Sequence, residues 1–264
     1  MYNFTYHRPA SVAEAASLLG ANEEAKLVAG GQTYIPTLKQ RLAQPAELID
    51  LGGITELKGI KEEAGGVTIG AMTRHADVAS SPVVQRLIPG LAALAEGIGD
   101  PQVRNLGTIG GSISNNDPAA DYPSAVVALG ATIRTNKREI AADDFFTGMF
   151  ETALDRDEIV TAVHFPKPEK SGYAKFPNPA SRYAMVGVFV ARTGGSVRVA
   201  VTGAAPCVFR WTEAEQALAS SMAPGALDGL SVSPDNLNGD IHASAEYRAH
   251  LIKVMARRAL EAAA

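Results

Sequence analysis

The chain contains a single cysteine, Cys207, among its 264 residues. One thiol excludes an internal disulfide, an iron–sulfur cluster held by four thiolates and a cysteine zinc site. The five histidines are scattered and show none of the spacings of a metal site such as H-E-x-x-H. Any redox chemistry in this protein therefore requires an organic cofactor.

A basic excess and a long apolar run are also missing. The formal net charge is −4 and lysine and arginine form no cluster, which argues against a nucleic-acid partner. No window approaches 18 uninterrupted apolar residues, and the N-terminus has no charged segment followed by an apolar one. We therefore expect neither a transmembrane segment nor a signal peptide, and a cytoplasmic protein or one bound peripherally through partners.

The composition is that of a well-packed globular protein, with 46% hydrophobic and 20% charged residues. The length suits one large domain or two ordinary ones. The composition shifts at the segment PKPEKSG, residues 166–172, which we interpret as a domain boundary.

The N-terminal region predicts a small β-α-β unit. Ser11-x-x-Glu14 has the form of a capping box and opens a first helix. KLVAGG (26–31) has the pattern of a short buried strand that ends in a glycine loop. YIPTLKQRL (34–42) has the pattern of a helix and ELIDL (47–51) that of a second strand.

The remaining elements follow from hydrophobic periodicity and turn signals. We expect Thr73 to cap the helix that follows it, and a single helix over 82–97. We expect Arg248 on the solvated face of the last helix. The predicted strands are 66–72, 131–135, 158–165, 183–191, 196–204 and 207–211, and the two C-terminal helices are near 212–220 and 245–262.

Two glycine pairs are candidates for phosphate binding. AGGQTY (29–34) directly follows a buried strand and precedes a helix, so its free backbone N–H groups suit an anion. An ordinary strand-to-helix turn is the alternative. The second pair lies in TIGGS (108–112), which offers two hydroxyls and two glycine amides. Neither matches a Rossmann or P-loop signature, and together they suggest a pyrophosphate held from both sides.

The second pair opens an unusually polar stretch, GTIGGSISNNDPAADYPSAVVALGA (107–131). We expect a long ordered loop here, with a helix starting only near Asp121. Asp121 either accepts bonds from ribose hydroxyls or caps that helix, whereas Asp117 suits turn stabilisation. Lys175 reaches a ring or a phosphate, or is simply a solvated surface residue. His75 is interpreted as structural, as is His164, and no catalytic acid, base or nucleophile stands out.

Six segments over roughly residues 1–190 stand out together: FTYHRPASVAEAASLL, KLVAGGQTYIPTLKQRL, PAELIDLGGI, VTIGAMTRHADV, IGDPQVRNLGTIGGSISNNDPAADYP and YAKFPNPASRYAMVGV. In this order they resemble the FAD-binding medium subunit of the carbon monoxide dehydrogenase and xanthine dehydrogenase family, the molybdenum hydroxylases. Thr33-Tyr34 and Arg74 depart from the residues frequent in that family, but neither departure touches the glycines.

The resemblance implies an α+β fold of the vanillyl-alcohol-oxidase (PCMH) type. Its FAD-binding domain would cover residues 1–170, in subdomains of about 1–55 and 56–170. A C-terminal domain of antiparallel strands plus helices would follow at 171–264.

The resemblance also implies which residues contact FAD. The two glycine loops would clasp the pyrophosphate, Asp121 would bind the adenosine ribose, and Lys175 would lie near the flavin ring, which Arg182 or Tyr183 would border. The implied cofactor-binding residues are Lys26, Leu27, Val28, Ala29, Gly30, Gly31, Gln32, Thr33, Tyr34, Val103, Gly107, Thr108, Ile109, Gly110, Gly111, Ser112, Ser114, Asn115, Asp121, Val160 and Lys175.

In such complexes a small subunit carries two [2Fe–2S] clusters and a large subunit carries a molybdenum–pterin cofactor. The resemblance implies a dimer of heterotrimers, peripheral at most to the inner membrane face, in which FAD delivers electrons to an external acceptor such as a quinone or NAD. The alternatives are a free-standing flavoenzyme of the same fold with its own substrate site, and a scaffold that has lost its cofactor.

Overall fold

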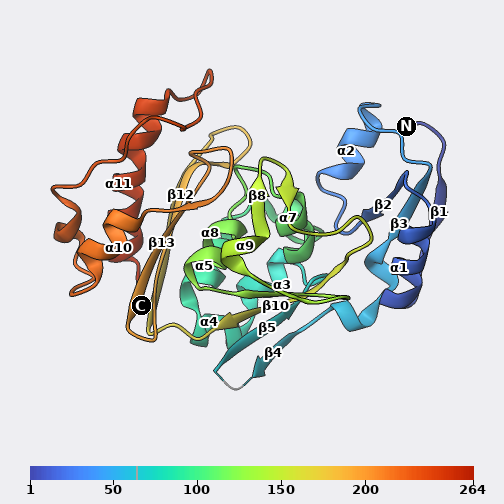
Figure 1. Cartoon of the computed structure of the whole chain (residues 1–264), viewed down its shortest axis with the longest axis horizontal. Helices are drawn as coiled ribbons and strands as arrows, with labels where there is room; N and C mark the ends of the chain where they lie inside the picture. The colour runs from blue at the N-terminus through green and yellow to red at the C-terminus, as the bar shows by residue number, and fades with distance from the viewer. Residues whose placement is uncertain (64) are drawn as a thin grey trace.

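The computed structural model describes residues 1–63 and 65–264. Figure 1 shows three parts in chain order: an N-terminal βα unit, a central part of sheet and helices, and a C-terminal sheet with helices on its outer side. The α+β architecture that the resemblance implied is confirmed.

The N-terminal sheet has three parallel strands, in the order β1 (Thr5–His7), β3 (Glu47–Asp50), β2 (Ala25–Val28). Helix α1 (Val12–Ala21) precedes β2, and α2 (Tyr34–Lys39) connects β2 to β3. The predicted β-α-β unit is therefore confirmed, and β2 ends before its glycine pair, as predicted. Two 3₁₀ turns then lead into the central part, at Leu51–Gly53 and Thr55–Leu57.

The central sheet is antiparallel throughout. Its strand order is β4 (Ile60–Glu63), β5 (Gly66–Gly70), β10 (Val160–Pro166), β6 (Thr132–Thr135), β7 (Glu139–Ala141). A separate hairpin is formed by β8 (Phe146–Gly148) and β9 (Glu151–Thr152).

Short helices and the inner residues of β5, β6 and β10 form the largest core cluster. The helices of this part are α3 (His75–Ser80), α4 (Pro82–Leu87), α5 (Pro89–Glu96), α6 (Pro101–Arg104), α7 (Ile109–Asn115), α8 (Tyr122–Ala128) and α9 (Ala142–Phe145).

The prediction of one helix over 82–97 is wrong, because the chain breaks into α4 and α5 at Ile88. Pro89 disfavours the helical conformation for the residue before it, and Ile88 has φ −142° and ψ 67°. Thr73 does not cap α3 either. Its hydroxyl donates to the Gly59 carbonyl and accepts from the Gly59 amide, at 3.1 and 3.0 Å.

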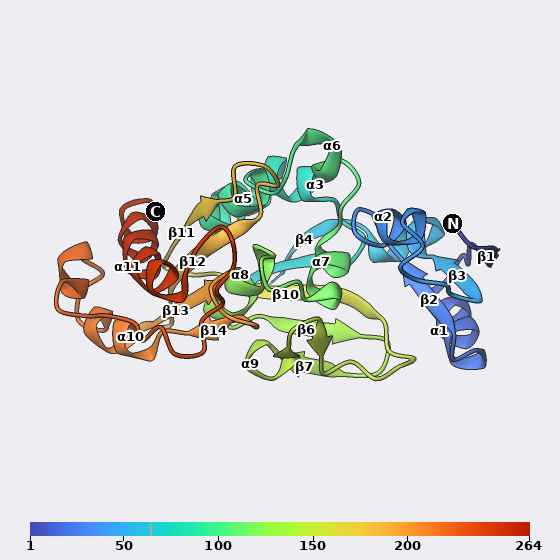
Figure 2. The same cartoon turned by 90° about the horizontal axis from the view of Figure 1, so that it is seen from above.

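The expected long loop over 107–121 is wrong in its first half, where α7 forms. Helix α7 lies on the side of the central sheet that faces α2 (Figure 2). The Thr108 side chain caps it by accepting from the Gly111 amide, and Asn116 ends it in the left-handed conformation. Two caps and burial of Ile109 and Ile113 outweigh the low helix propensity of glycine and serine.

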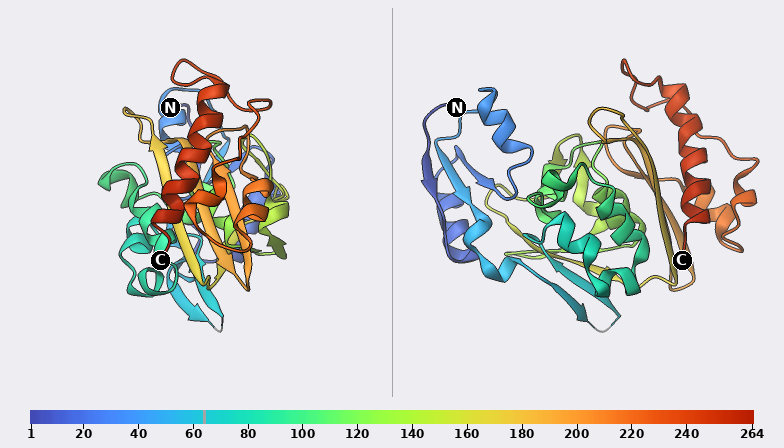
Figure 3. Two further views of the ribbon diagram at one scale, coloured as in Figure 1. Left: turned by 90° about the vertical axis from the view of Figure 1, so that its left-hand side faces the viewer. Right: turned by 180° about the vertical axis from the view of Figure 1, so that it is seen from behind.

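The C-terminal sheet is packed on both faces. The elements of this part are β11 (Lys170–Pro177), β12 (Ala184–Thr193), β13 (Ser196–Thr202), β14 (Phe209–Arg210), α10 (Thr212–Leu218), a 3₁₀ turn (Pro224–Leu227) and α11 (Ala245–Glu261). Figure 3 shows the sheet between α11 and α10 on one side and the helices of the central part on the other. Consecutive residues of β12, such as Val188 and Phe189, therefore enter two different cores.

The prediction that Arg248 of α11 lies on a solvated face is wrong, because this residue is only 4% exposed. Its guanidinium donates to the carbonyls of Met185 and Gly203 and pairs with Asp240 at 2.7 Å. The helical period places this position toward the sheet, where carbonyls at a strand end need donors.

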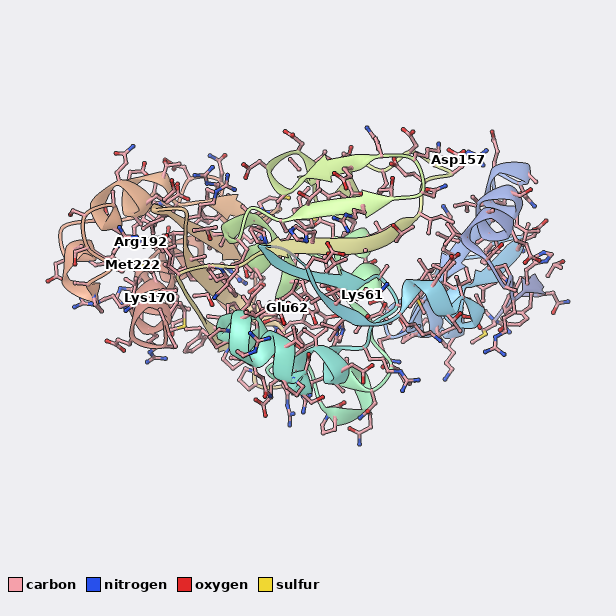
Figure 4. All side chains as sticks on the ribbon, turned by 90° about the horizontal axis from the view of Figure 1, so that it is seen from below. Lys61, Glu62, Asp157, Lys170, Arg192 and Met222 are labelled. Atoms are coloured by element: carbon pink, nitrogen blue, oxygen red, sulfur yellow. The ribbon has the colours of Figure 1, made fainter. Side chains whose placement is uncertain are left out.

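The loop before β10 also joins the N-terminal unit to the central part. Arg156 donates to the Gly20 carbonyl at the end of α1, at 3.2 Å, and Asp157, labelled in Figure 4, lies beside the same glycine. Within residues 1–63 and 65–264, no helix is both long and apolar enough to cross a bilayer.

Candidate functional site

A cavity of about 650 Å³ opens where the three parts of the molecule meet. The first glycine loop with β2 lines one side, and Gly107 with α7 lines another. Residues of the segment 150–160 and of the loop 181–183 also line it. The volume is in the range typical of pockets that bury a small molecule.

Most of the predicted cofactor-binding residues line this one cavity, although they come from distant parts of the sequence. The exceptions are Ile109, which is wholly buried in the core, and Lys175. The residues that line it are Lys26, Leu27, Val28, Ala29, Gly30, Gly31, Gln32, Thr33, Tyr34, Val103, Gly107, Thr108, Gly110, Gly111, Ser112, Ser114, Asn115, Asp121 and Val160.

The first glycine loop presents free backbone donors to the cavity. The amides of Gly31, Gln32 and Thr33 donate to no acceptor in the part of the chain that the structure describes. Gly31 has φ +72°, a conformation that favours glycine. A Cβ on Gly30 would lie 2.1 Å from the Leu106 carbonyl oxygen, so the backbone of this loop rests directly on the segment before α7.

The second glycine pair does not offer free amides, and that prediction is wrong. The Gly110 amide donates to the Ala71 carbonyl at 2.8 Å, and the Gly111 amide donates to Thr108 Oγ1 at 3.2 Å. A Cβ on Gly110 would lie 2.6 Å from the Ala71 side chain, so the glycine serves close packing of α7 against the end of β5. The residues with polar side chains that α7 adds to the lining are Ser112, Ser114 and Asn115.

Asp121 lines the cavity and is 4% exposed. It stands at the N-cap position of α8 but makes no capping bond, so the capping alternative is wrong. Lys175 Nζ lies 2.9 Å from its Oδ1, and Tyr173 donates to the same oxygen at 2.5 Å. Burial raises the pKa of Asp121, and the charge of Lys175 and the Tyr173 bond oppose that shift.

Lys175 is therefore not a solvated surface residue, which was one of the two alternatives, and it does not line the cavity either. Its side chain is 11% exposed, and its ammonium also donates to the Arg182 carbonyl at 3.0 Å. Arg182 and Tyr183, which the resemblance implied at the border of the flavin, line the cavity from this loop. Asp117 stabilises a turn, as predicted, by accepting from the Ala119 amide at 2.9 Å.

His75 is buried, as its structural interpretation requires, but it also lines the cavity, which its position in the sequence did not indicate. Burial and the nearby Arg104 lower the pKa of His75 to about 4, so the imidazole is neutral. Its Nδ1 is buried and has no hydrogen-bond partner among the described residues. Its Nε2 lies 2.6 Å from the place a Cβ would take on Gly107.

Glu158 and Phe150 are two of several further lining residues that were missed from the sequence. Glu158 is 3% exposed, and its hydrogen bond to Arg138 holds the pKa of the carboxyl at about 2. Phe150 is 57% exposed at the β8–β9 turn with φ +56°, and its amide donates to the Asn116 carbonyl at 3.1 Å. Neither residue belongs to a sequence motif, and each reaches the cavity through tertiary contacts. No signal in the sequence therefore pointed to them.

Comparison with known proteins decides the family. The family model of the FAD binding domain in molybdopterin dehydrogenase matches residues 2–168, and that of the CO dehydrogenase flavoprotein C-terminal domain matches residues 171–263. This chain belongs to the FAD-binding medium subunits of the molybdenum hydroxylases.

Individual relatives match the medium subunit over nearly its whole length. It is 36% identical to the nicotine 6-hydroxylase medium subunit of Paenarthrobacter nicotinovorans, covering 97% of this chain and 95% of that one. It is 37% identical to the carbon monoxide dehydrogenase medium chain of Hydrogenophaga pseudoflava, covering 98% and 96%. A solved structure of carbon monoxide dehydrogenase from Hydrogenophaga pseudoflava matches with a TM-score of 0.88 and 38% identity, covering 99% and 97%.

The cofactor of this medium subunit is FAD, and the cavity fits it. The unpaired amides of Gly31, Gln32 and Thr33 are the donors that a pyrophosphate requires. The buried Nδ1 of His75 is a second polar atom without a hydrogen-bond partner among the described residues, which a ligand or a water would supply. All three parts of the chain contribute to its lining, as expected of a site for an extended molecule such as a dinucleotide.

Proposed function

We propose that this subunit holds FAD in the cavity and passes electrons from [2Fe–2S] clusters of a partner subunit to an external acceptor, a quinone or NAD. The single observation that carries the proposal is the row of unpaired amides in the first glycine loop, set in a cavity that all three parts of the chain line. FAD supplies the redox chemistry when bound, since it accepts and releases electrons. The chain supplies binding, orientation and exclusion of water.

The roles of the lining residues follow from their chemistry. The amides of Gly31, Gln32 and Thr33 bind the pyrophosphate, and the hydroxyls of Ser112 and Ser114 on α7 face it from the other side. The remaining predicted residues of the lining complete the pocket, and in this proposal the two domains divide at residue 170.

The partners in this proposal are the [2Fe–2S] small subunit and the molybdenum–pterin large subunit, assembled as a dimer of heterotrimers in the cytoplasm. Substrate is oxidised on the large subunit, so the residues of this chain do not determine which substrate is oxidised. Relatives named for nicotine hydroxylation and for carbon monoxide oxidation support that separation, since similar medium chains serve both.

The test is a titration of the purified chain with FAD and, in parallel, with FMN, followed by flavin fluorescence. FMN lacks the pyrophosphate and the adenosine, so we expect tight binding of FAD and weak binding of FMN. Gly30→Ala should weaken FAD binding at least about tenfold, because the added Cβ pushes the first loop away from Leu106.

Gly229→Ala is the matched control, because a Cβ there meets nothing within 4 Å. Equal affinity for FAD and FMN would overturn the assignment of the glycine loop to the pyrophosphate. Transfer of electrons from a reduced [2Fe–2S] partner to the loaded chain, measured by stopped-flow absorbance, tests the electron relay. A loaded chain that oxidises an organic substrate unaided would instead support the free-standing flavoenzyme.

A further inference from the structure

Two arginines meet at one backbone carbonyl beside the cavity. Nη1 of Arg104, on α6, donates to the carbonyl oxygens of Ile98 and Gly99 at 3.0 and 3.3 Å. Nη1 of Arg182, in the loop after β11, donates to the same Gly99 oxygen at 3.3 Å. The two nitrogens are therefore separated by at most twice that distance, although they come from different parts of the chain.

No carboxylate balances the charge of this arginine pair. All the side-chain hydrogen bonds of Arg104 and Arg182 within residues 1–63 and 65–264 end on backbone carbonyls, and neither forms an ion pair there. Asp100, the acid next to Gly99, is engaged at the N-cap of α6, where it accepts from the Val103 amide at 2.8 Å. Two like charges this close repel each other, so the pair is suited to a bound anion.

The backbone fixes both arginines in advance. Gly99 has φ +50°, and a Cβ there would lie 3.0 Å from the Val103 side chain, so this tight turn requires glycine. Arg182 has φ +62°, which is uncommon for a residue other than glycine. Its amide donates to the Asn178 carbonyl at 2.8 Å, and its carbonyl accepts from Lys175 Nζ at 3.0 Å. A strained residue held by such bonds is typical of functional sites.

The arginine pair lies at the opening of the cavity. Ile98, Gly99 and Arg182 line the cavity and Arg182 is exposed, whereas the half-buried Arg104 lies outside the lining. The proposed function already assigns the pyrophosphate of FAD to the amides of the first glycine loop. An anion at the arginine pair therefore belongs to a second molecule, one that approaches the cofactor from solvent as an electron acceptor must.

We infer that Arg104 and Arg182 bind a phosphate group of the external electron acceptor, which makes this acceptor a nicotinamide dinucleotide and not an uncharged quinone. The inference rests on the proposed function and names the acceptor within it. Guanidinium groups present forked N–H donors that match the oxygens of a phosphate, whereas a neutral quinone leaves both charges unpaired.

The experiment measures binding of ADP-ribose to the FAD-loaded, full-length chain by isothermal titration calorimetry. ADP-ribose is NAD without its nicotinamide, so it binds without electron transfer, and adenosine is the probe that lacks phosphate. The wild type should bind ADP-ribose at least about tenfold more tightly than adenosine, the effect expected for hydrogen bonds between charged groups. Arg104→Gln and Arg182→Gln should each weaken ADP-ribose binding about tenfold and leave adenosine binding unchanged. Arg104→Lys should keep most of the affinity, since the charge returns.

Equal affinity of the wild type for ADP-ribose and adenosine would overturn the inference, and so would glutamine variants that bind ADP-ribose as tightly as the wild type does. FAD affinity, measured by flavin fluorescence, should be unchanged in Arg104→Gln, which also shows that this variant is folded. A tenfold loss of FAD affinity there would assign the arginine pair to the cofactor's own pyrophosphate and overturn the inference. Failure of the wild type to bind FAD would instead reject the proposed function itself.

Arg258→Gln is the matched control, because Arg258 is exposed on α11, on the outer side of the C-terminal sheet (Figure 3). This variant should bind ADP-ribose as the wild type does. Raising the salt concentration provides a second test, since salt screens the attraction between an arginine and a phosphate. It should weaken ADP-ribose binding to the wild type and leave adenosine binding unchanged, and an ADP-ribose affinity independent of salt would contradict the inference.

Discussion

The buried imidazole of His75, in the cavity lining, makes the stability of the protein depend on pH. His75 is 5% exposed and packs against the ring of Tyr122, with centroids 5.3 Å apart. Its lowered pKa means that the folded protein binds a proton there less readily than the unfolded chain does. Between the unfolded value of 6.5 and the folded value of about 4, the unfolded state binds more protons, so stability falls as the pH falls through this window.

The pH dependence of unfolding should therefore change when His75 is replaced. One pKa unit corresponds to about 1.4 kcal/mol, so between pH 7 and pH 4 the wild type should lose roughly 3 kcal/mol more stability than His75→Gln. Urea unfolding across this pH range measures the difference. The exposed His242 provides the control, since His242→Gln should follow the wild type. Parallel curves for wild type and His75→Gln would contradict the neutral buried imidazole.

At the scale of elements, α7 depends on its two ends and on its neighbours. Its seven residues, IGGSISN, are poor helix formers, and an isolated helix of this length is not stable in water. Asn116 ends the helix with φ +42°, and its side-chain amide donates to the carbonyls of Gly148 and Glu151, both at 2.8 Å. One residue thus terminates α7 and attaches the β8–β9 hairpin to it.

Substitutions of Asn116 separate these two contributions. Asn116→Gly keeps the left-handed backbone but removes both side-chain bonds, so it should destabilise the protein by about 2 kcal/mol. Asn116→Ala should cost about 1–2 kcal/mol more, since a Cβ is disfavoured in that conformation. Urea denaturation of both variants measures the two steps. An alanine variant as stable as the glycine variant would contradict the second step.

Asn236 is the matched control for these variants. It also has a left-handed backbone, with φ +68°, but it is exposed and its side chain makes no hydrogen bond to another described residue. Asn236→Gly should therefore leave stability unchanged to within about 0.5 kcal/mol.

For the whole molecule, the central part and the C-terminal sheet share one core. Phe189 of β12 and Ala200 of β13 belong to the same buried cluster as Leu91 of α5 and Val126 of α8. The single tryptophan, Trp211, lies in the other core of the sheet and is 3% exposed. Because the sheet links both cores, the parts should unfold together.

Two probes test this cooperativity in the FAD-loaded chain. Trp211 fluorescence reports the C-terminal core and flavin release reports the cavity, and both should share one urea midpoint. Phe189→Leu should lower both midpoints together, by roughly 1 kcal/mol of stability, whereas Leu42→Ala, at a position 74% exposed, should move neither. A shift of the tryptophan transition alone would show that the two parts unfold independently.

Local signals in the sequence were sufficient for the first glycine loop and the strands beside it. KLVAGG followed by YIPT is a short apolar strand, a glycine turn and a helix start, and each of these depends on residues only a few positions apart. The same holds for the meander of β12 and β13, whose apolar runs are separated by Gly194-Gly195. The cavity residues were placed by resemblance, which carries tertiary information that one sequence does not.

The sequence by itself determined the absence of a four-thiolate cluster, the glycine turn between β2 and α2 and most of the strands, because composition and short-range periodicity decide these. Only the tertiary structure decided that α7 is a helix, that Gly110 serves packing, and that Arg248 is buried. It also brought Asp121 together with Tyr173 and Lys175, more than 50 residues along the chain. Burial, closed hydrogen bonds and close backbone approach arise from contacts between distant segments, and these override local propensity.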